Sequence, residues 1–175
     1  AAGLWPGRHG RRSALRTAAG HEGDRTDMSD HDPARALNVV VIGASTGGPS
    51  TLARLLAFLP ADFHLPIVVA QHIPSGWAEN LAVHLQGHCK LAVHRAKPFD
   101  QLGPGGVYLA PGDMNIEITS TWKARIHAQE TSCGIRPSVD LLLQTAAEVA
   151  EARALAIILT GMGKDGLEGA RKIRA

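Results

Sequence analysis

The 175-residue chain has few cysteines, few aromatic residues and no long apolar run. Cys89 and Cys133 are its only cysteines and stand apart, which argues against a disulfide framework and favours a reducing compartment. Aromatic residues make up only 4%, so there is little surface on which nucleic-acid bases could stack. No apolar run approaches the roughly 18 residues that a membrane-spanning helix needs.

An excess of charge of one sign is also lacking. The 18 Lys and Arg residues face 16 Asp and Glu residues, and the basic residues are dispersed. We therefore expect no nucleic-acid partner, and the lack of a long apolar run argues against membrane insertion. Because the first residues, Ala1 to Pro6, have no apolar stretch of the signal-peptide kind, we expect a soluble cytoplasmic protein.

Two regions differ in composition. Residues 1–36 are rich in Ala, Gly and Arg, mix basic with acidic residues, and show no sustained period of 2 or 3.6. Such a segment cannot bury much apolar surface, and we expect it to be disordered. Residues 37–175 carry the patterns of a single α/β domain, which is long enough for a sizeable core.

Strand and helix patterns alternate at both ends of that domain. The expected order is strand 38–42, helix 48–59, strand 66–70 and helix 77–86, then helix 137–150, strand 155–159 and a last helix from about 166. Between them, residues 91–127 hold short alternating runs broken by Gly and Pro, which we interpret as hairpin-like pieces. The pattern predicts a mostly parallel, doubly wound sheet with helices on both faces and a small β-hairpin insertion.

Polar residues follow three of the apolar strands. Ser45 comes after Val39–Ile42, His72 after Ile67–Ala70, and Asp165 after the strand that ends near Leu159. Because the carboxyl ends of parallel strands meet at one edge of a sheet, a hydroxyl, an imidazole and a carboxylate are expected to converge there. These groups are the parts of a nucleophilic hydrolase.

Each of the three residues has alternatives. The glycine-rich loop around Ser45 matches a nucleophile elbow, but it also resembles a dinucleotide-binding loop, and Ser45 could simply cap a turn. A His72 at a strand end is often only a packed rim residue. Asp165, three positions before Glu168, resembles a capping box for the last helix. A nucleotide site would need an acidic residue where Gln71 and His72 stand.

Other candidates carry weaker signals. His84 and His88 are four positions apart on a helix with Cys89 adjacent, which is a zinc-like set, but an exposed helix face explains them better. Asp113 is typical of a turn, and Asp140 suits the first turn of a helix. We therefore expect no metal and no cofactor.

Five ordered motifs resemble the catalytic domain of the CheB family, the chemotaxis protein-glutamate methylesterases. They are Val41–Gly48, Gln71–Pro74, Tyr108–Asp113, Arg136–Asp140 and Leu159–Gly166. The resemblance implies a catalytic triad of Ser45, His72 and Asp165, with Thr46 and the backbone N–H of Met162 lining the site. It also implies hydrolysis of glutamate γ-methyl esters on chemoreceptor cytoplasmic domains, with release of methanol, and in many members deamidation of receptor glutamines.

The chain departs from that family in three places. Its 36 preceding residues are too few for the receiver domain that members usually carry, and Ile135 replaces a His that often precedes the Arg136 motif. The chain also stops ten residues after Asp165, where the family continues, so we expect the C-terminal part of the catalytic domain to be missing. This absence motivates a second hypothesis, a non-catalytic regulatory or adaptor remnant.

Overall fold

The computed structural model describes residues 37–174; the predicted disorder of residues 1–36 lies outside the described residues. The elements in chain order are β1 (Val39–Ala44), α1 (Gly48–Ala57), β2 (Ile67–Gln71), α2 (Ala78–Gln86), β3 (Ala92–Arg95), β4 (Gly106–Leu109), β5 (Asn115–Ile118), β6 (Ala124–His127), α3 (Val139–Ala150), the 3₁₀ turn η2 (Glu151–Arg153), β7 (Ala154–Ile158) and α4 (Leu167–Arg174). The predicted strands and helices at both ends of the domain are present, with ends shifted by one or two residues.

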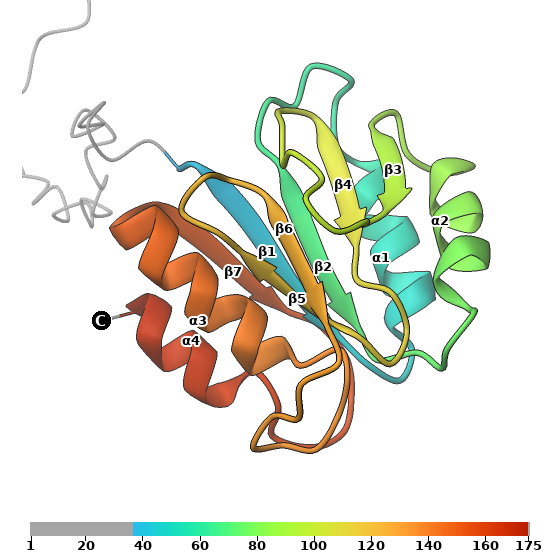
Figure 1. The fold of residues 1–175 in the computed structure, drawn as a ribbon. Coiled ribbons are helices and arrows are strands. Elements are labelled where there is room, and N and C mark those ends of the chain that lie inside the picture. Colours follow the sequence, from blue (N-terminus) through green and yellow to red (C-terminus); the bar gives the residue numbers. More distant parts are fainter. Residues whose placement is uncertain (1–36, 175) are drawn as a thin grey trace, which may run out of the picture. The chain divides into compact units, whose positions relative to one another are not determined.

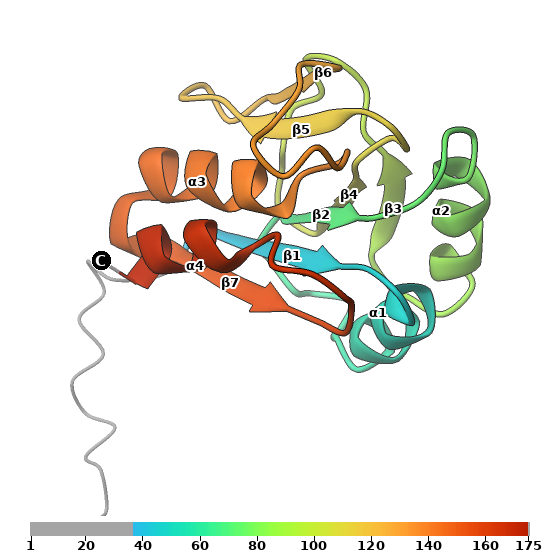
Figure 2. The ribbon, with the colours of Figure 1, turned by 90° about the horizontal axis from the view of Figure 1, so that it is seen from below.

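A five-stranded sheet of order β3-β4-β2-β1-β7 forms the centre of this domain, and each neighbouring pair is parallel (Figure 1). Helices α3 and α4 lie on one face of the sheet and α1 and α2 on the other (Figure 2). This confirms the doubly wound prediction. The sheet order puts β1 and β2 side by side and β7 next to β1, so three strands that are distant in sequence end together.

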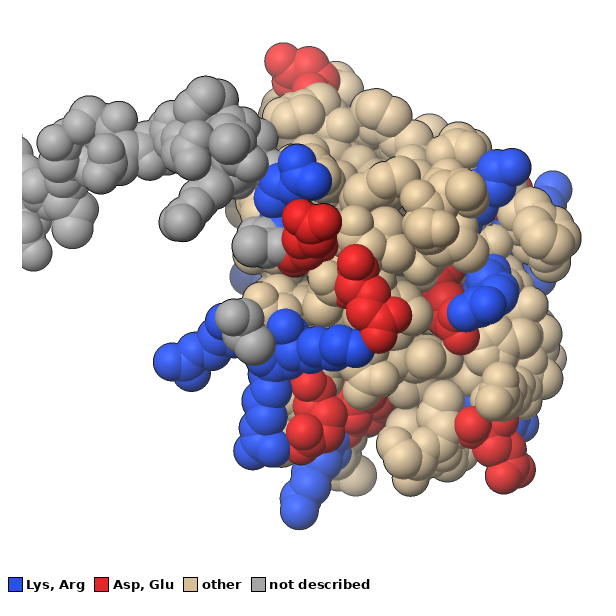
Figure 3. All heavy atoms as spheres, turned by 60° about the vertical axis from the view of Figure 1, so that its left-hand side comes forward, with Lys and Arg blue, Asp and Glu red and all other residues tan. Residues whose placement is uncertain are grey.

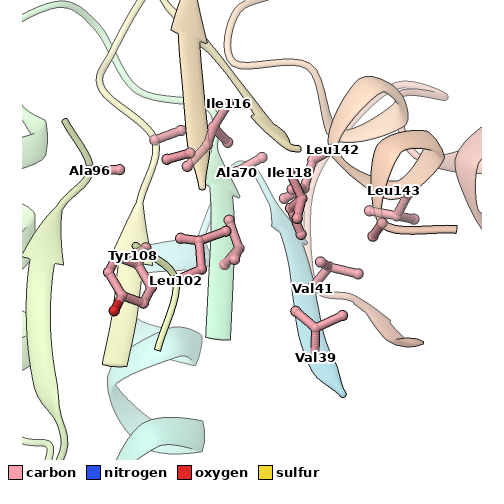
Figure 4. Packing of buried hydrophobic residues seen from close by; sticks show 14 of the residues in the cluster. Val39, Val41, Ala70, Ala96, Leu102, Tyr108, Ile116, Ile118, Leu142 and Leu143 are labelled. Carbon is pink, nitrogen blue, oxygen red and sulfur yellow. The ribbon is translucent and has the colours of Figure 1, made fainter. Parts of the chain in front are cut away.

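The sheet separates two hydrophobic clusters, and β1 contributes to both. Val39 and Val41 pack with α3 and the β5–β6 hairpin, as Figure 4 shows, whereas Val40 and Ile42 pack with α1 and α2. All six residues of β1 are buried. A strand buried on both faces reads as a continuous apolar run, which is the pattern that the sequence shows. Full burial of a Val or Ile side chain contributes roughly 1.5–3 kcal/mol to the stability of the fold.

The hairpin-like interpretation of residues 91–127 is correct only in part. Strands β5 and β6 pair antiparallel as a hairpin, but Val107–Leu109 belongs to β4, which pairs parallel to β2 and to β3 in the main sheet. Strands β3 and β4 have four residues each, which is too few for their periodicity to identify their partners. The long-range pairing therefore decided the position of β4.

The surface charges and the helices bear on the sequence-based expectations. On the face shown in Figure 3, Lys and Arg side chains lie among Asp and Glu side chains. No single-sign patch develops on that face. Among the helices of residues 37–174, none is both long enough and apolar enough to cross a membrane.

Candidate active site

The candidate site lies where β1 and β2 end. Ser45 and His72 are the residues directly after these strands, and main-chain hydrogen bonds continue the sheet to both of them. The His72 N–H donates to the carbonyl of Ala44 at 2.9 Å, and the Ser45 N–H donates to the carbonyl of Thr160 at 3.0 Å. The backbone of the two residues is therefore held by the sheet itself rather than by a free loop.

The three predicted side chains form one hydrogen-bonded chain. Ser45 Oγ lies 3.1 Å from His72 Nδ1, and His72 Nε2 lies 2.9 Å from Asp165 Oδ2. An ionised carboxylate can only accept, so Nε2 must carry the proton and Nδ1 is left as an acceptor for the Ser45 hydroxyl. This is the arrangement of a hydroxyl, a base and an orienting acid, with Nδ1 rather than Nε2 facing the hydroxyl.

Asp165 is held in place by the start of α3. Its carboxylate accepts from the N–H of Val139 at 2.8 Å and of Asp140 at 2.9 Å, and from Ser138 Oγ at 3.2 Å. The side chain is only 2% exposed. The N-terminus of a helix presents unpaired N–H groups and a positive dipole end, so it stabilises a buried carboxylate.

These contacts answer the capping alternative. The capping box considered as an alternative for Asp165 and Glu168 does not form, because Glu168 pairs with Arg171 at 2.6 Å and the Asp165 carboxylate points to α3 and His72. The cap of α4 comes instead from Asp140, whose Oδ1 accepts from the Gly169 N–H at 2.8 Å. Asp165, just before α4, thus accepts from the first turn of α3, and Asp140, in the first turn of α3, accepts from the first turn of α4.

The electrostatics favour an ionised Asp165. Burial by itself raises the pKa of this carboxyl, but the hydrogen bond from His72 and those from the Asp140 and Val139 N–H groups outweigh burial and hold the pKa below its ordinary value. An ionised Asp165 keeps the proton on Nε2 of His72. The basic nitrogen therefore faces Ser45.

Two glycines let the loops come this close. Gly47 has a φ of 78°, in the left-handed region that glycine adopts without strain, and it caps α1 just after Ser45. A Cβ placed on Gly161 would lie 2.5 Å from the Cβ of Ser45, so the loop after β7 can pack on Ser45 only with glycine at this position.

A cleft of about 90 Å³ opens over these residues, and Ser45, His72, Asp165 and Met162 are among those that line it. The Met162 side chain is 81% exposed. Thr46 is exposed and does not line the cleft, although it follows Ser45 directly. Within residues 37–174, the backbone N–H groups of Thr46 and Met162 have no hydrogen-bond acceptor in the protein.

The other candidates lie outside this site. A cavity of about 470 Å³ beside β3 and β4 is larger, but its lining includes Arg95, Lys97 and Tyr108 and no Ser, Thr or Cys side chain. His84 is exposed on α2 and His88 is exposed in the turn after it, and Cys89 is buried with its Sγ accepting from Leu91 N. Over residues 37–174, no group of three or more His, Cys, Asp or Glu side chains is placed to hold a metal ion.

Sequence reasoning missed two contributors. Ser138 supports Asp165 and also caps α3, accepting from the Leu141 N–H at 3.2 Å. The helix predicted from residue 137 placed Ser138 inside it, whereas α3 begins at Val139 and Ser138 is its N-cap. Gln71, at the position where a nucleotide site needs an acid, is buried and donates to backbone carbonyls of the site. The Gln71 side chain is therefore a neutral amide used inside the protein, and the acid that a nucleotide site needs for its ribose is lacking at this position.

Known proteins are similar to this chain in sequence and in fold. The model of the CheB methylesterase family matches residues 40–175. The protein-glutamate methylesterase/protein-glutamine glutaminase of Thermotoga maritima is 40% identical over 149 residues, which cover 81% of this chain and 42% of the relative. The protein of the same name from Trichodesmium erythraeum is 42% identical over 143 residues, or 79% of this chain and 40% of the relative.

A solved structure agrees with these relatives. The crystal structure of the Thermotoga maritima CheB methylesterase catalytic domain superposes with a TM-score of 0.75 at 40% identity, covering 79% of this chain and 75% of that chain. The chain belongs to the CheB methylesterase family. It spans about two fifths of the length of the curated relatives.

Proposed function

We propose that this protein is a serine-type esterase that hydrolyses glutamate γ-methyl esters on the cytoplasmic domains of methylated chemoreceptors. The observation that carries the proposal is the hydrogen-bonded chain from Ser45 through His72 to Asp165. Membership of the CheB methylesterase family supports the substrate, and the names of the curated relatives support the reaction. The proposed location is the cytoplasm, where such a receptor domain lies.

In the proposed first step, Ser45 Oγ attacks the ester carbonyl carbon while its proton passes to His72 Nδ1. Asp165, fixed by α3, stabilises the imidazolium that forms. Collapse of the tetrahedral intermediate breaks the bond to the methoxy oxygen, which takes the proton from His72 and leaves as methanol. Water then attacks the acyl-enzyme with His72 as the base, which releases the glutamate carboxylate and restores Ser45.

The backbone N–H groups of Thr46 and Met162 are the proposed donors to the oxyanion. They come from the loops after β1 and β7, so the oxyanion would be bound between the nucleophile and the loop that brings Asp165. Loss of one such donor typically costs roughly 2.7–4 kcal/mol of transition-state stabilisation.

The same machinery suits a glutamine side chain. Attack on the carboxamide carbon gives the same acyl-enzyme, with ammonia in place of methanol as the leaving group. The curated relatives carry both activities in their names, and we propose receptor glutamine deamidation as the second reaction.

The test is methanol release from methyl-labelled receptor by the chain and by a Ser45→Ala variant. We expect a loss on the order of 10⁶-fold, the size seen when a triad serine is removed. Ser120→Ala, in the exposed turn between β5 and β6, is the matched control and should keep the wild-type rate. Release that persists in Ser45→Ala would refute the proposal.

A further inference from the structure

One buried amide contacts the backbone of both Ser45 and His72. Gln71, the last residue of β2, is 3% exposed. Its Nε2 donates to the Ser45 carbonyl at 2.8 Å and to the His72 carbonyl at 3.1 Å. A single NH₂ group therefore links the turn that carries the hydroxyl to the strand end that carries the imidazole.

The partners determine which way the amide faces. The reverse orientation would place the Gln71 oxygen against two carbonyl oxygens, and none of the three could donate. With Nε2 on the carbonyls, Oε1 is buried and has no hydrogen-bond partner among the described residues. A buried acceptor without a partner destabilises the fold, so the Gln71 amide lowers the stability of the folded chain at this position.

Gly48, the first residue of α1, leaves room for that amide. A Cβ built on Gly48 would lie 1.8 Å from Gln71 Oε1 and 2.7 Å from Gln71 Cδ. The Gly48 N–H donates to the Ser45 carbonyl at 2.8 Å, so the same oxygen accepts from both residues. Any side chain at position 48 must push the amide away from the Ser45 turn.

We propose that Gln71 is a positioning residue, which sets the distance between Ser45 Oγ and His72 Nδ1 by tying both backbones to one amide, and that Gly48 is required because of it. The inference rests on the proposed function. Gln71 itself touches no reacting atom. Its effect is on the geometry from which Ser45 gives up its proton.

The first test is Gln71→Met, which keeps the length and removes the donor. Labelling of Ser45 by a fluorophosphonate serine probe reports the activated hydroxyl without needing the receptor. We expect the maximal labelling rate to fall by roughly 10- to 100-fold, because small misplacements of reacting groups cost rates of this size. The half-saturating probe concentration should not change, since the cleft residues are all retained.

The second test is a double-mutant cycle. Gly48→Ala and Gln71→Ala should each slow labelling, the first because the added methyl group displaces the amide. The double variant should label within about twofold of Gln71→Ala, because the methyl group at position 48 then has no amide to displace and its next neighbour is the Ala44 Cβ at 3.0 Å. Effects that multiply in the double variant would show that Gly48 and Gln71 act independently, and this result would overturn the proposal.

Loss of stability is separated from loss of positioning by a control. Val93→Ala removes buried apolar atoms from β3, which β4 separates from β2, and it should label at the wild-type rate below its unfolding temperature. Gln71→Met that labels as fast as wild type while folded overturns the positioning role. Wild-type labelling without methanol release from receptor overturns only the proposed substrate, and a wild-type chain that does not label overturns both.

Discussion

The two sides of the candidate site are positioned in different ways. Ser45 and His72 follow β1 and β2, in which every residue is buried. Asp165 comes from the loop after β7, an edge strand that is only partly buried, with Ile158 50% exposed and Met162 81% exposed in the loop. Ser45 and His72 thus follow the most enclosed strands of the sheet, whereas Asp165 follows its edge strand.

The difference shows that a side chain can be fixed by hydrogen bonds even when the strand before it is only partly buried. The sheet positions Ser45 and His72 through main-chain hydrogen bonds. The position of Asp165 depends instead on Ser138 and the first N–H groups of α3. Changes at the start of α3 should therefore affect the position of Asp165, and changes near β1 should affect that of Ser45.

The largest effect expected on the acid side is that of Asp165→Asn. The Asn amide would present a donor either to His72 or to the α3 N–H groups, and a donor at Nε2 would move the imidazole proton to the nitrogen that faces Ser45. We expect methanol release to fall on the order of 10⁴-fold, as for the same change in a serine-protease triad. A rate within about tenfold of wild type would show that the acid is dispensable.

Gly161→Ala tests where the two sides meet. The new Cβ would lie 2.5 Å from the Ser45 Cβ, so the loop or the nucleophile must shift. A shift of this size should lower the rate by roughly 100-fold. Gly87→Ala, at the end of α2 with 3.4 Å to its nearest neighbour, is the matched control and should leave the rate unchanged.

Ser138→Ala removes one support of Asp165 and the cap of α3. Loss of the cap should lower the free energy of unfolding by about 1 kcal/mol. The lost hydrogen bond to the carboxylate should slow methanol release by roughly 10-fold, since bonds to charged groups are worth about 1.5–3 kcal/mol. The exposed Ser132 offers a control nearby, and equal rates for Ser138→Ala and Ser132→Ala would contradict the support role.

The smallest effect concerns acid stability. Because the pKa of Asp165 is lowered in the folded chain, its ionised form stabilises the fold above the unfolded value of about 3.9, and this contribution is lost as the pH falls through the lower folded value. The difference in unfolding free energy between wild type and Asp165→Asn should therefore shrink between about pH 5 and strong acid. Urea unfolding across this range measures it; a constant difference would contradict the lowered pKa.

Much of the site was predictable because its residues follow apolar runs that are easy to recognise. The strand patterns before Ser45 and His72 predicted both positions, and the resemblance to the CheB family added Met162. The support of Asp165 by α3 could not be predicted, since Ser138 and Asp165 are 27 positions apart and neither pattern points to the other. The same holds for β4, whose four residues give no sign of their parallel partners.

The sequence by itself determined the α/β class, the buried strands and the chemical types that follow them, because these depend on local periodicity and turn residues. Only the tertiary structure decided that the Asp165 carboxylate accepts from the first N–H groups of α3 instead of capping its own helix, and that the Gln71 amide lies in the space left by Gly48. Both arrangements depend on hydrogen bonds between segments that the sheet brings together, and the geometry of such bonds is not encoded in any one stretch of chain.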